Sequence, residues 1–174
     1  MKKENFIIPW SPRSHYYSKK ERASVLDIID NADILSQGKW LSKFEKKFLN
    51  YLNSKGKAFA VTSGASAIEL AANVLKLKKN DEVIIPSHTY CATALPFTRY
   101  DVKIKWADIN KDDFTIDVEH VKKLINKKTK AIVAVHLYGL PCEIIKLKKL
   151  CKQKKIYLIE DCAQSLGSKI KDRK

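Results

Sequence analysis

The chain has 174 residues, of which 45% are hydrophobic, with only 5 glycines and 5 prolines. This length and composition predict a globular protein with a real core and exclude a disordered chain. The net charge of +15 raises the question of nucleic acid, but the lysines are spread over helix-like stretches along the whole chain. We therefore interpret the charge as solvated surface and keep nucleic-acid binding as the minority interpretation.

The cysteines and the apolar segments bear on the cellular location. Cys91, Cys142, Cys151 and Cys162 form no C-x-x-C pair, which favours reduced thiols over disulfides or a zinc site. No apolar stretch is long enough to span a membrane. Residues 1–10 are expected to be extended, and the apolar run within them is too short for a signal peptide. The sequence predicts a cytoplasmic, soluble protein with no metal site.

Residues 1–55 are predicted to form an N-terminal helical segment. A helix is expected over 18–32, where apolar residues form a stripe. A second amphipathic helix is expected over 40–52, where Trp40 and Phe44 lie four residues apart on one face.

Residues 56–174 are predicted to form an α/β domain, because strands and helices alternate along them. The expected strands are 58–62, 82–85, 102–107, 131–135 and 156–159. The expected helices are 66–75, 91–100, 117–125 and 142–153. Pro96 should shorten or kink the second of these helices, and Asp117 is a suitable N-cap for the third. The alternation predicts a mostly parallel sheet with helices on both faces.

A run of small residues, Thr62–Ala67, joins a predicted strand to a predicted helix. Gly64 would let the backbone turn tightly, and the helix N-terminus would offer free N–H groups to a phosphate, beside Ala65 and the Ser66 hydroxyl. The segment is neither a G-x-G-x-x-G fingerprint nor a Walker loop. Taken alone, it fits a helix cap without a ligand slightly better than a phosphate site.

Four further side chains follow predicted strands. Tyr90 is suited to stack on a planar ligand or to pack in the core, and His136 to reach the same cleft or to serve the fold. Asp161 is suited to hold a protonated pyridine nitrogen or to cap a helix, and Gln164 offers an amide donor. Because the carboxyl ends of parallel strands share one edge, these groups are expected to converge there.

The order of these motifs is specific when they are taken together. The segments are Gly38–Trp40, Phe44–Glu45, Thr62–Ala67, Pro86–Tyr90, Val135–Gly139 and Glu160–Gly167. In this order, from about Ser18 onward, the chain resembles the DegT/DnrJ/EryC1/StrS family. That family comprises pyridoxal-phosphate-dependent aminotransferases that act on keto-sugar nucleotides and have the aspartate-aminotransferase fold (fold type I).

The resemblance implies which residues contact the cofactor, pyridoxal 5'-phosphate. Gly64, Ala65 and Ser66 match the family's phosphate-binding turn, although the family often has threonine at the position of Ala65. Tyr90 matches the aromatic residue that stacks on the pyridine ring. Asp161 matches the acid that pairs with the ring nitrogen.

The resemblance also implies roles for two residues beside Asp161. Gln164 matches the group that contacts the phenolic oxygen of the cofactor. His136 matches a histidine of the motif after its strand, and its role stays open as part of a candidate site.

The family's Schiff-base lysine is expected beyond Lys174, and none of Lys169, Lys171 and Lys174 matches it. The resemblance therefore implies an N-terminal part of the large domain, without the C-terminal domain and without a catalytic residue of its own. It also implies a homodimer that uses glutamate as amino donor in surface-polysaccharide or amino-sugar biosynthesis. The alternatives are a sugar dehydratase of the same family, which has histidine at the lysine position, a non-catalytic binding module, or a basic nucleic-acid binder.

Overall fold

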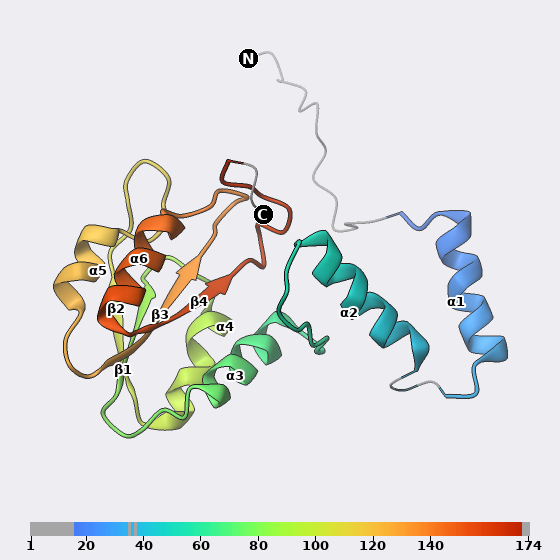
Figure 1. The fold of residues 1–174 in the computed structure, drawn as a ribbon, viewed down its shortest axis with the longest axis horizontal. Coiled ribbons are helices and arrows are strands. Elements are labelled where there is room, and N and C mark those ends of the chain that lie inside the picture. The colour runs from blue at the N-terminus through green and yellow to red at the C-terminus, as the bar shows by residue number, and fades with distance from the viewer. Residues whose placement is uncertain (1–15, 35, 37, 172–174) are drawn as a thin grey trace, which may run out of the picture. The chain divides into compact units, whose positions relative to one another are not determined.

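The computed structural model describes residues 16–34, 36 and 38–171. The chain divides into two compact units, residues 1–60 and residues 61–174 (Figure 1). The extended segment expected at the N-terminus lies outside the described residues. No described helix has both the length and the apolar character that a membrane span requires.

The first unit contains helices α1 (Lys19–Asn31) and α2 (Lys39–Tyr51), close to the two predicted helices. Helix α1 begins at a capping box, in which the Ser18 hydroxyl accepts from the Glu21 N–H and the Glu21 carboxylate accepts from the Ser18 N–H. None of the residues in these two helices is buried. Their amphipathic pattern therefore predicts the helices correctly, whereas their apolar stripes lie at least partly exposed.

The second unit is built on a parallel sheet of four strands, β1 (Glu82–Pro86), β2 (Lys103–Ala107), β3 (Thr129–Val135) and β4 (Tyr157–Asp161). The strand order across the sheet is β2-β1-β3-β4. The two apolar runs, β1 and β3, occupy the centre, where both faces of a strand are buried. The strand with alternating lysines, β2, lies at an edge and is partly exposed.

Helices cover both faces of this sheet, as the sequence predicts (Figure 1). They are α3 (Gly64–Val74), α4 (Cys91–Ala94), the 3-10 helix η1 (Leu95–Tyr100), α5 (Val118–Leu124) and α6 (Ile144–Lys154). Val83 and Ile85 of β1 pack with α3, α4 and η1 on one face, and Ile84 packs with α5 and α6 on the other. The alternating directions of strand side chains thus produce two separate cores.

The chain reverses its direction across the sheet between β1 and β3. It leaves β1 for β2 through α4 and η1 on one face, and then returns past β1 to β3 through α5 on the opposite face. At such a switch point the loops after the two strands diverge, and α/β proteins place ligands in the resulting crevice. The loops after β1 and β3 are therefore the first place to look for a site.

The strand predicted over residues 58–62 is wrong, because the structure has no strand there. Phe59 and Val61 are 67% and 42% exposed, and the segment pairs with none of the four described strands. The Ala60 N–H donates instead to the Glu45 carboxylate at 3.0 Å. An apolar alternation is not sufficient for a strand when no neighbouring strand supplies hydrogen bonds.

Two local predictions about helices are confirmed. The helical stretch over 91–100 changes at Leu95 from an α-helix to a 3-10 helix, with Pro96 in the first turn of the latter. The Asp117 carboxylate accepts from the N–H groups of Glu119 and His120 at 2.8 and 3.3 Å and so caps α5.

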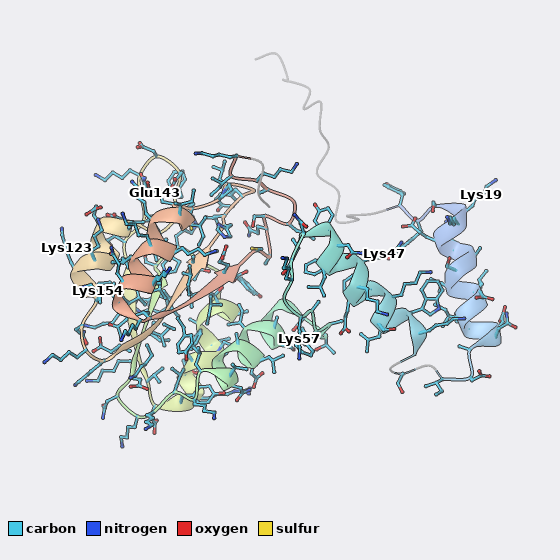
Figure 2. All side chains as sticks on the ribbon, in the orientation of Figure 1. Lys19, Lys47, Lys57, Lys123, Glu143 and Lys154 are labelled. Carbon is cyan, nitrogen blue, oxygen red and sulfur yellow. The ribbon has the colours of Figure 1, made fainter. Side chains whose placement is uncertain are left out.

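The lysines of α5 and α6 lie on the solvent side of the second unit (Figure 2). Lys123 and Lys154, for example, are both exposed, whereas Val121 and Leu150 in the same helices are buried against the sheet. The interpretation of these lysines as solvated surface is confirmed for the helices that the structure describes.

The burial of the four thiols predicts their reactivity. Cys91 and Cys162 are exposed, whereas Cys142 and Cys151 are buried, and burial raises the pKa of the Cys151 thiol to about 11. In the folded chain at pH 8, dithionitrobenzoate should modify Cys91 and Cys162 rapidly and the other two slowly. All four should react in guanidinium, and four fast thiols without denaturant would contradict this packing.

Candidate functional site

The loops after β1, β3 and β4 are joined by hydrogen bonds at the carboxyl edge of the sheet. The Tyr138 N–H, after β3, donates to the Gln164 side-chain oxygen at 3.1 Å. The Tyr138 hydroxyl lies 3.4 Å from Nε2 of His88, after β1. The structure therefore brings the motifs predicted around residues 88, 138 and 164 to one place.

The Asp161 side chain is held through both of its carboxylate oxygens. Oδ2 accepts from the Thr93 hydroxyl at 2.9 Å, and Oδ1 accepts from the Ala163 N–H at 3.1 Å. The bond from the Ala163 N–H is local and is the kind of contact that a capping role of Asp161 predicts. The bond from Thr93 instead joins β4 to α4. A carboxylate has about four acceptor sites, so it can accept a further N–H while making both bonds.

Tyr90 and Gln164 expose groups that a planar ligand could contact. Tyr90 is 74% exposed and sits at the N-cap of α4. The Gln164 oxygen accepts from a backbone N–H, so its amide nitrogen is the atom left to donate. The ring and the amide thus meet the chemical requirements for stacking and for donation to an oxyanion.

The N-terminus of α3 offers unsatisfied donors beside a group of hydroxyls. The Ser63 hydroxyl accepts from the Ser66 N–H at 3.1 Å, and the Ser66 hydroxyl lies 3.1 Å from that of Thr62. Within the part of the chain that the structure describes, the N–H groups of Gly64 and Ala65 have no acceptor. Unpaired N–H groups at the positive end of a helix suit an anion.

The conformation of Gly64 differs from the tight turn that the sequence suggests. It has ordinary helical geometry at the first position of α3, and an added Cβ would meet nothing within 4 Å. The backbone turn therefore does not require glycine. A side chain at this position would point into open space.

His136 is 5% exposed, and both of its ring nitrogens contact protein groups. Nδ1 accepts from the Cys142 N–H at 3.1 Å, and Nε2 lies 3.2 Å from the Glu160 carboxylate. Glu160 and Asp161 are consecutive in β4, so their side chains point to opposite faces of the sheet. Neither ring nitrogen of His136 is free for a ligand in this arrangement, and a cofactor role for it stays a prediction.

Two influences act on the protonation of His136. Contacts with the Cys142 side chain and, to a lesser extent, with Cys162 and Glu160 raise the pKa of the ring, while burial lowers it. The Cys142 amide acts against the charged form, because an N–H that donates to Nδ1 requires that nitrogen to carry no proton. Protonation of Nδ1 would set two N–H donors against each other, so the proton of the ring lies on Nε2, which faces the Glu160 carboxylate.

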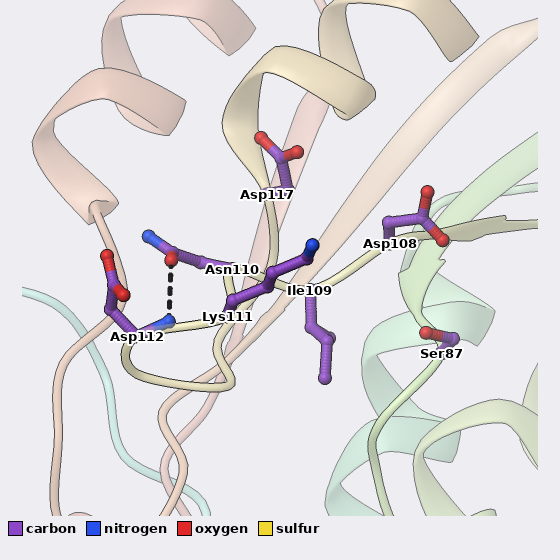
Figure 3. Close-up of a pocket in the computed structure, with 7 residues that line it drawn as sticks. All are labelled: Ser87, Asp108, Ile109, Asn110, Lys111, Asp112 and Asp117. Atoms are coloured by element: carbon purple, nitrogen blue, oxygen red, sulfur yellow. Dashed lines mark hydrogen bonds between the residues drawn. The ribbon is translucent and has the colours of Figure 1, made fainter.

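A shallow hollow of about 750 Å³ lies beside this site, at the ends of β1 and β2 (Figure 3). It is lined by Ser87, Asp108, Ile109, Asn110, Lys111, Asp112 and Asp117. Asn110 and Asp117 hold backbone N–H groups of their own loop and of α5. None of the residues predicted to contact a cofactor lines the hollow, so we place the candidate site at the ends of β1, β3 and β4.

Sequence reasoning missed Thr93 and Tyr138. Thr93 follows Thr89 by four residues, and in a helical turn this spacing places two hydroxyls on the same side. This spacing is the one sign in the sequence that the two threonines could act together. Tyr138 has a left-handed backbone (φ 53°), which is rare for an aromatic residue and cannot be read from the sequence.

Comparison with known proteins gives one family. The sequence profile of the DegT/DnrJ/EryC1/StrS aminotransferase family matches residues 16–174. GDP-perosamine synthase of Vibrio cholerae is 39% identical over 154 residues, which cover 88% of this chain and 42% of that protein. GDP-4-keto-6-deoxy-D-mannose 3-dehydratase of Yersinia pseudotuberculosis is 32% identical over 163 residues, 90% of this chain and 41% of that protein.

Solved structures agree with the sequence relatives. The Escherichia coli GDP-4-keto-6-deoxy-D-mannose-3-dehydratase with bound hydrated PLP superposes with a TM-score of 0.87 at 27% identity, over 97% of this chain and 44% of that chain. An aminotransferase from Psychrobacter cryohalolentis superposes with a TM-score of 0.86 at 29% identity, over 95% of this chain and 42% of that chain. The chain thus spans less than half the length of these proteins. The fold is that of fold type I enzymes.

The tautomer of His136 can be measured directly. In the 15N-labelled chain at pH 7, Nε2 should show the chemical shift of a protonated nitrogen and Nδ1 that of an unprotonated one. Glu160→Gln should preserve this pattern, because the Cys142 amide still donates to Nδ1. Two protonated nitrogens at pH 7 would contradict the assignment.

Proposed function

The chain belongs to the DegT/DnrJ/EryC1/StrS aminotransferase family, and we propose that it forms the cofactor-binding part of a pyridoxal 5'-phosphate-dependent enzyme acting on a nucleotide sugar. The observation that carries this proposal is the Asp161 carboxylate, held at the sheet edge by Thr93 and Ala163. Its place at the end of β4, beside Gln164, suits a cationic ring nitrogen.

The donors at the N-terminus of α3 fit the phosphate of this cofactor. The N–H groups of Gly64 and Ala65 and the hydroxyl of Ser66 would hold it, with the helix dipole favouring its negative charge. The open space around the Cβ position of Gly64 is compatible with a phosphate close to this turn.

The groups at the strand ends fit the pyridine ring. Tyr90 would stack on its face, the Gln164 amide would donate to its phenolic oxygen, and Asp161 would keep its nitrogen protonated. When bound, the cofactor supplies an electron sink for the bonds at an amino-bearing carbon. The residues of this chain would hold and orient the pyridine ring, and would maintain the positive charge on its nitrogen that makes the ring electron-withdrawing.

The reaction that we propose is transfer of an amino group from glutamate to a keto-sugar nucleotide, in amino-sugar or surface-polysaccharide biosynthesis. It is supported by relatives that include GDP-perosamine synthase and a dTDP-amino-sugar transaminase. We also propose that the enzyme is a homodimer, as the family resemblance implies, and that it is cytoplasmic, as the pattern of unpaired cysteines suggests.

A sugar dehydratase is the second candidate, because dehydratases are among the relatives in both sequence and structure. The residue that separates the two reactions, lysine or histidine, is placed by the resemblance beyond Lys174. A binding module without catalysis is a third hypothesis, which stable, monomeric folding of the chain by itself would support.

Neutralising Asp161 should weaken cofactor binding. For Asp161→Asn, which keeps the shape but loses the charge, the dissociation constant for pyridoxal phosphate, measured by fluorescence titration, should rise about 10- to 100-fold, since a charged hydrogen bond contributes about 1.5–3 kcal/mol. Asp112→Asn removes an exposed carboxylate of the neighbouring hollow and should leave the constant unchanged. Equal constants for the wild type and Asp161→Asn would count against the site.

Borohydride reduction tests whether a lysine of this chain bonds to the cofactor. If the lysine lies where the resemblance places it, reduction of the 174-residue chain with pyridoxal phosphate should label surface lysines only sparsely and at random. Peptide mass mapping checks this. Stoichiometric label on one lysine would show that the chain carries its own Schiff-base residue.

A further inference from the structure

Three side chains at the site form a continuous line of hydrogen bonds. The hydroxyl oxygens of Thr89 and Thr93 lie 2.9 Å apart, and the Thr93 hydroxyl lies 2.9 Å from Oδ2 of Asp161. An ionised carboxylate can only accept, so the single hydroxyl proton of Thr93 is donated to Asp161. The Thr89 hydroxyl must then donate to Thr93, and the direction of the whole line is fixed.

The middle member of this line is shielded from water. Thr93 is 2% exposed, while Thr89 and Asp161 are half-buried. A buried hydroxyl that loses its partner is not compensated by solvent, so the bond between Thr93 and Asp161 is costly to break. This bond therefore restrains the carboxylate more firmly than an exposed contact would.

The line also joins the two elements that would contact the ring. Thr89 directly precedes Tyr90 in the loop after β1, Thr93 lies in α4, and Asp161 ends β4, 68 residues further along the chain. With Ala163 holding Oδ1 and Thr93 holding Oδ2, the carboxylate cannot rotate about its last bond without losing a hydrogen bond.

The chemistry of the donor matters as much as its place. A threonine hydroxyl is neutral, so it orients Asp161 without neutralising its charge. A lysine or arginine at this position would form an ion pair and compete with a cationic ligand. A hydroxyl thus leaves the full negative charge available on the exposed side of the carboxylate.

We propose that Thr93 is the positioning residue of Asp161, supported by Thr89, and that this line of hydroxyls aims the carboxylate at the ring nitrogen of the bound cofactor. The inference rests on the proposed function and adds two residues to it. Neither threonine touches the cofactor in this role; both act through Asp161.

The test uses Thr93→Val, which keeps the shape of the side chain and removes its hydroxyl, and Thr93→Ser, which restores the hydroxyl. The measurements are the dissociation constant for pyridoxal phosphate and the 15N chemical shift of its labelled pyridine nitrogen when bound. Thr93→Val should raise the constant about tenfold, equivalent to about 1.4 kcal/mol, and move the shift toward the unprotonated value. Thr93→Ser should stay near the wild type in both.

Thr98→Val is the matched control. Its hydroxyl is exposed and donates to the Leu95 carbonyl within η1, so its loss should change neither measurement. A threonine with only a structural role would lower stability without moving the shift of bound cofactor. If Thr93→Val fails to fold by circular dichroism, Thr89→Val replaces it and should shift the nitrogen signal in the same direction.

Asp161→Asn separates the two proposals. If it weakens binding while the valine variants of Thr93 and Thr89 behave as wild type, the inference about the hydroxyl line is wrong and the proposed function stands. If Asp161→Asn binds as wild type, the proposed function itself fails. If both kinds of variant lose affinity and Thr93→Ser recovers it, the positioning role is supported.

Discussion

The hydrogen bond from Thr93 to Asp161 is the contact on which the site depends. It crosses from the helix after the first strand of the sheet to the tip of the fourth, and it does so inside the protein, where a lost partner is not replaced by water. The parallel sheet makes this contact possible, because it brings the carboxyl ends of strands distant in sequence to one edge. The loop that carries Tyr90 and the strand tip that carries Asp161 are thereby held at a fixed separation.

The consecutive acids Glu160 and Asp161 show how one strand serves two purposes. Side chains of a strand alternate between faces, so Glu160 contacts the buried His136 on one side while Asp161 meets Thr93 on the other. Glu160 and His136 contact each other within the protein, and the Cys142 amide donates to the other nitrogen of the His136 ring. Glu160 therefore contacts a buried ring and Asp161 the helix after β1, which gives the two carboxylates different surroundings.

The sequence predicts most of the second unit because its signals are strong and local. The apolar runs of β1 and β3 and the Asp117 cap of α5 need no information beyond a few neighbouring residues. The strand expected around Phe59 fails because strand formation requires a partner, and none of the described strands pairs with this segment. Thr93 could not be identified for a similar reason, since its role depends on a residue 68 positions away.

A crystal structure of the chain with pyridoxal phosphate tests the central claim most directly. The account predicts the ring nitrogen at about 2.6–3.2 Å from the Asp161 carboxylate, with the Tyr90 ring against the face of the pyridine and the phosphate at the N-terminus of α3. A cofactor bound elsewhere, for example in the hollow beside Asp112, or one whose nitrogen does not face Asp161, would contradict it.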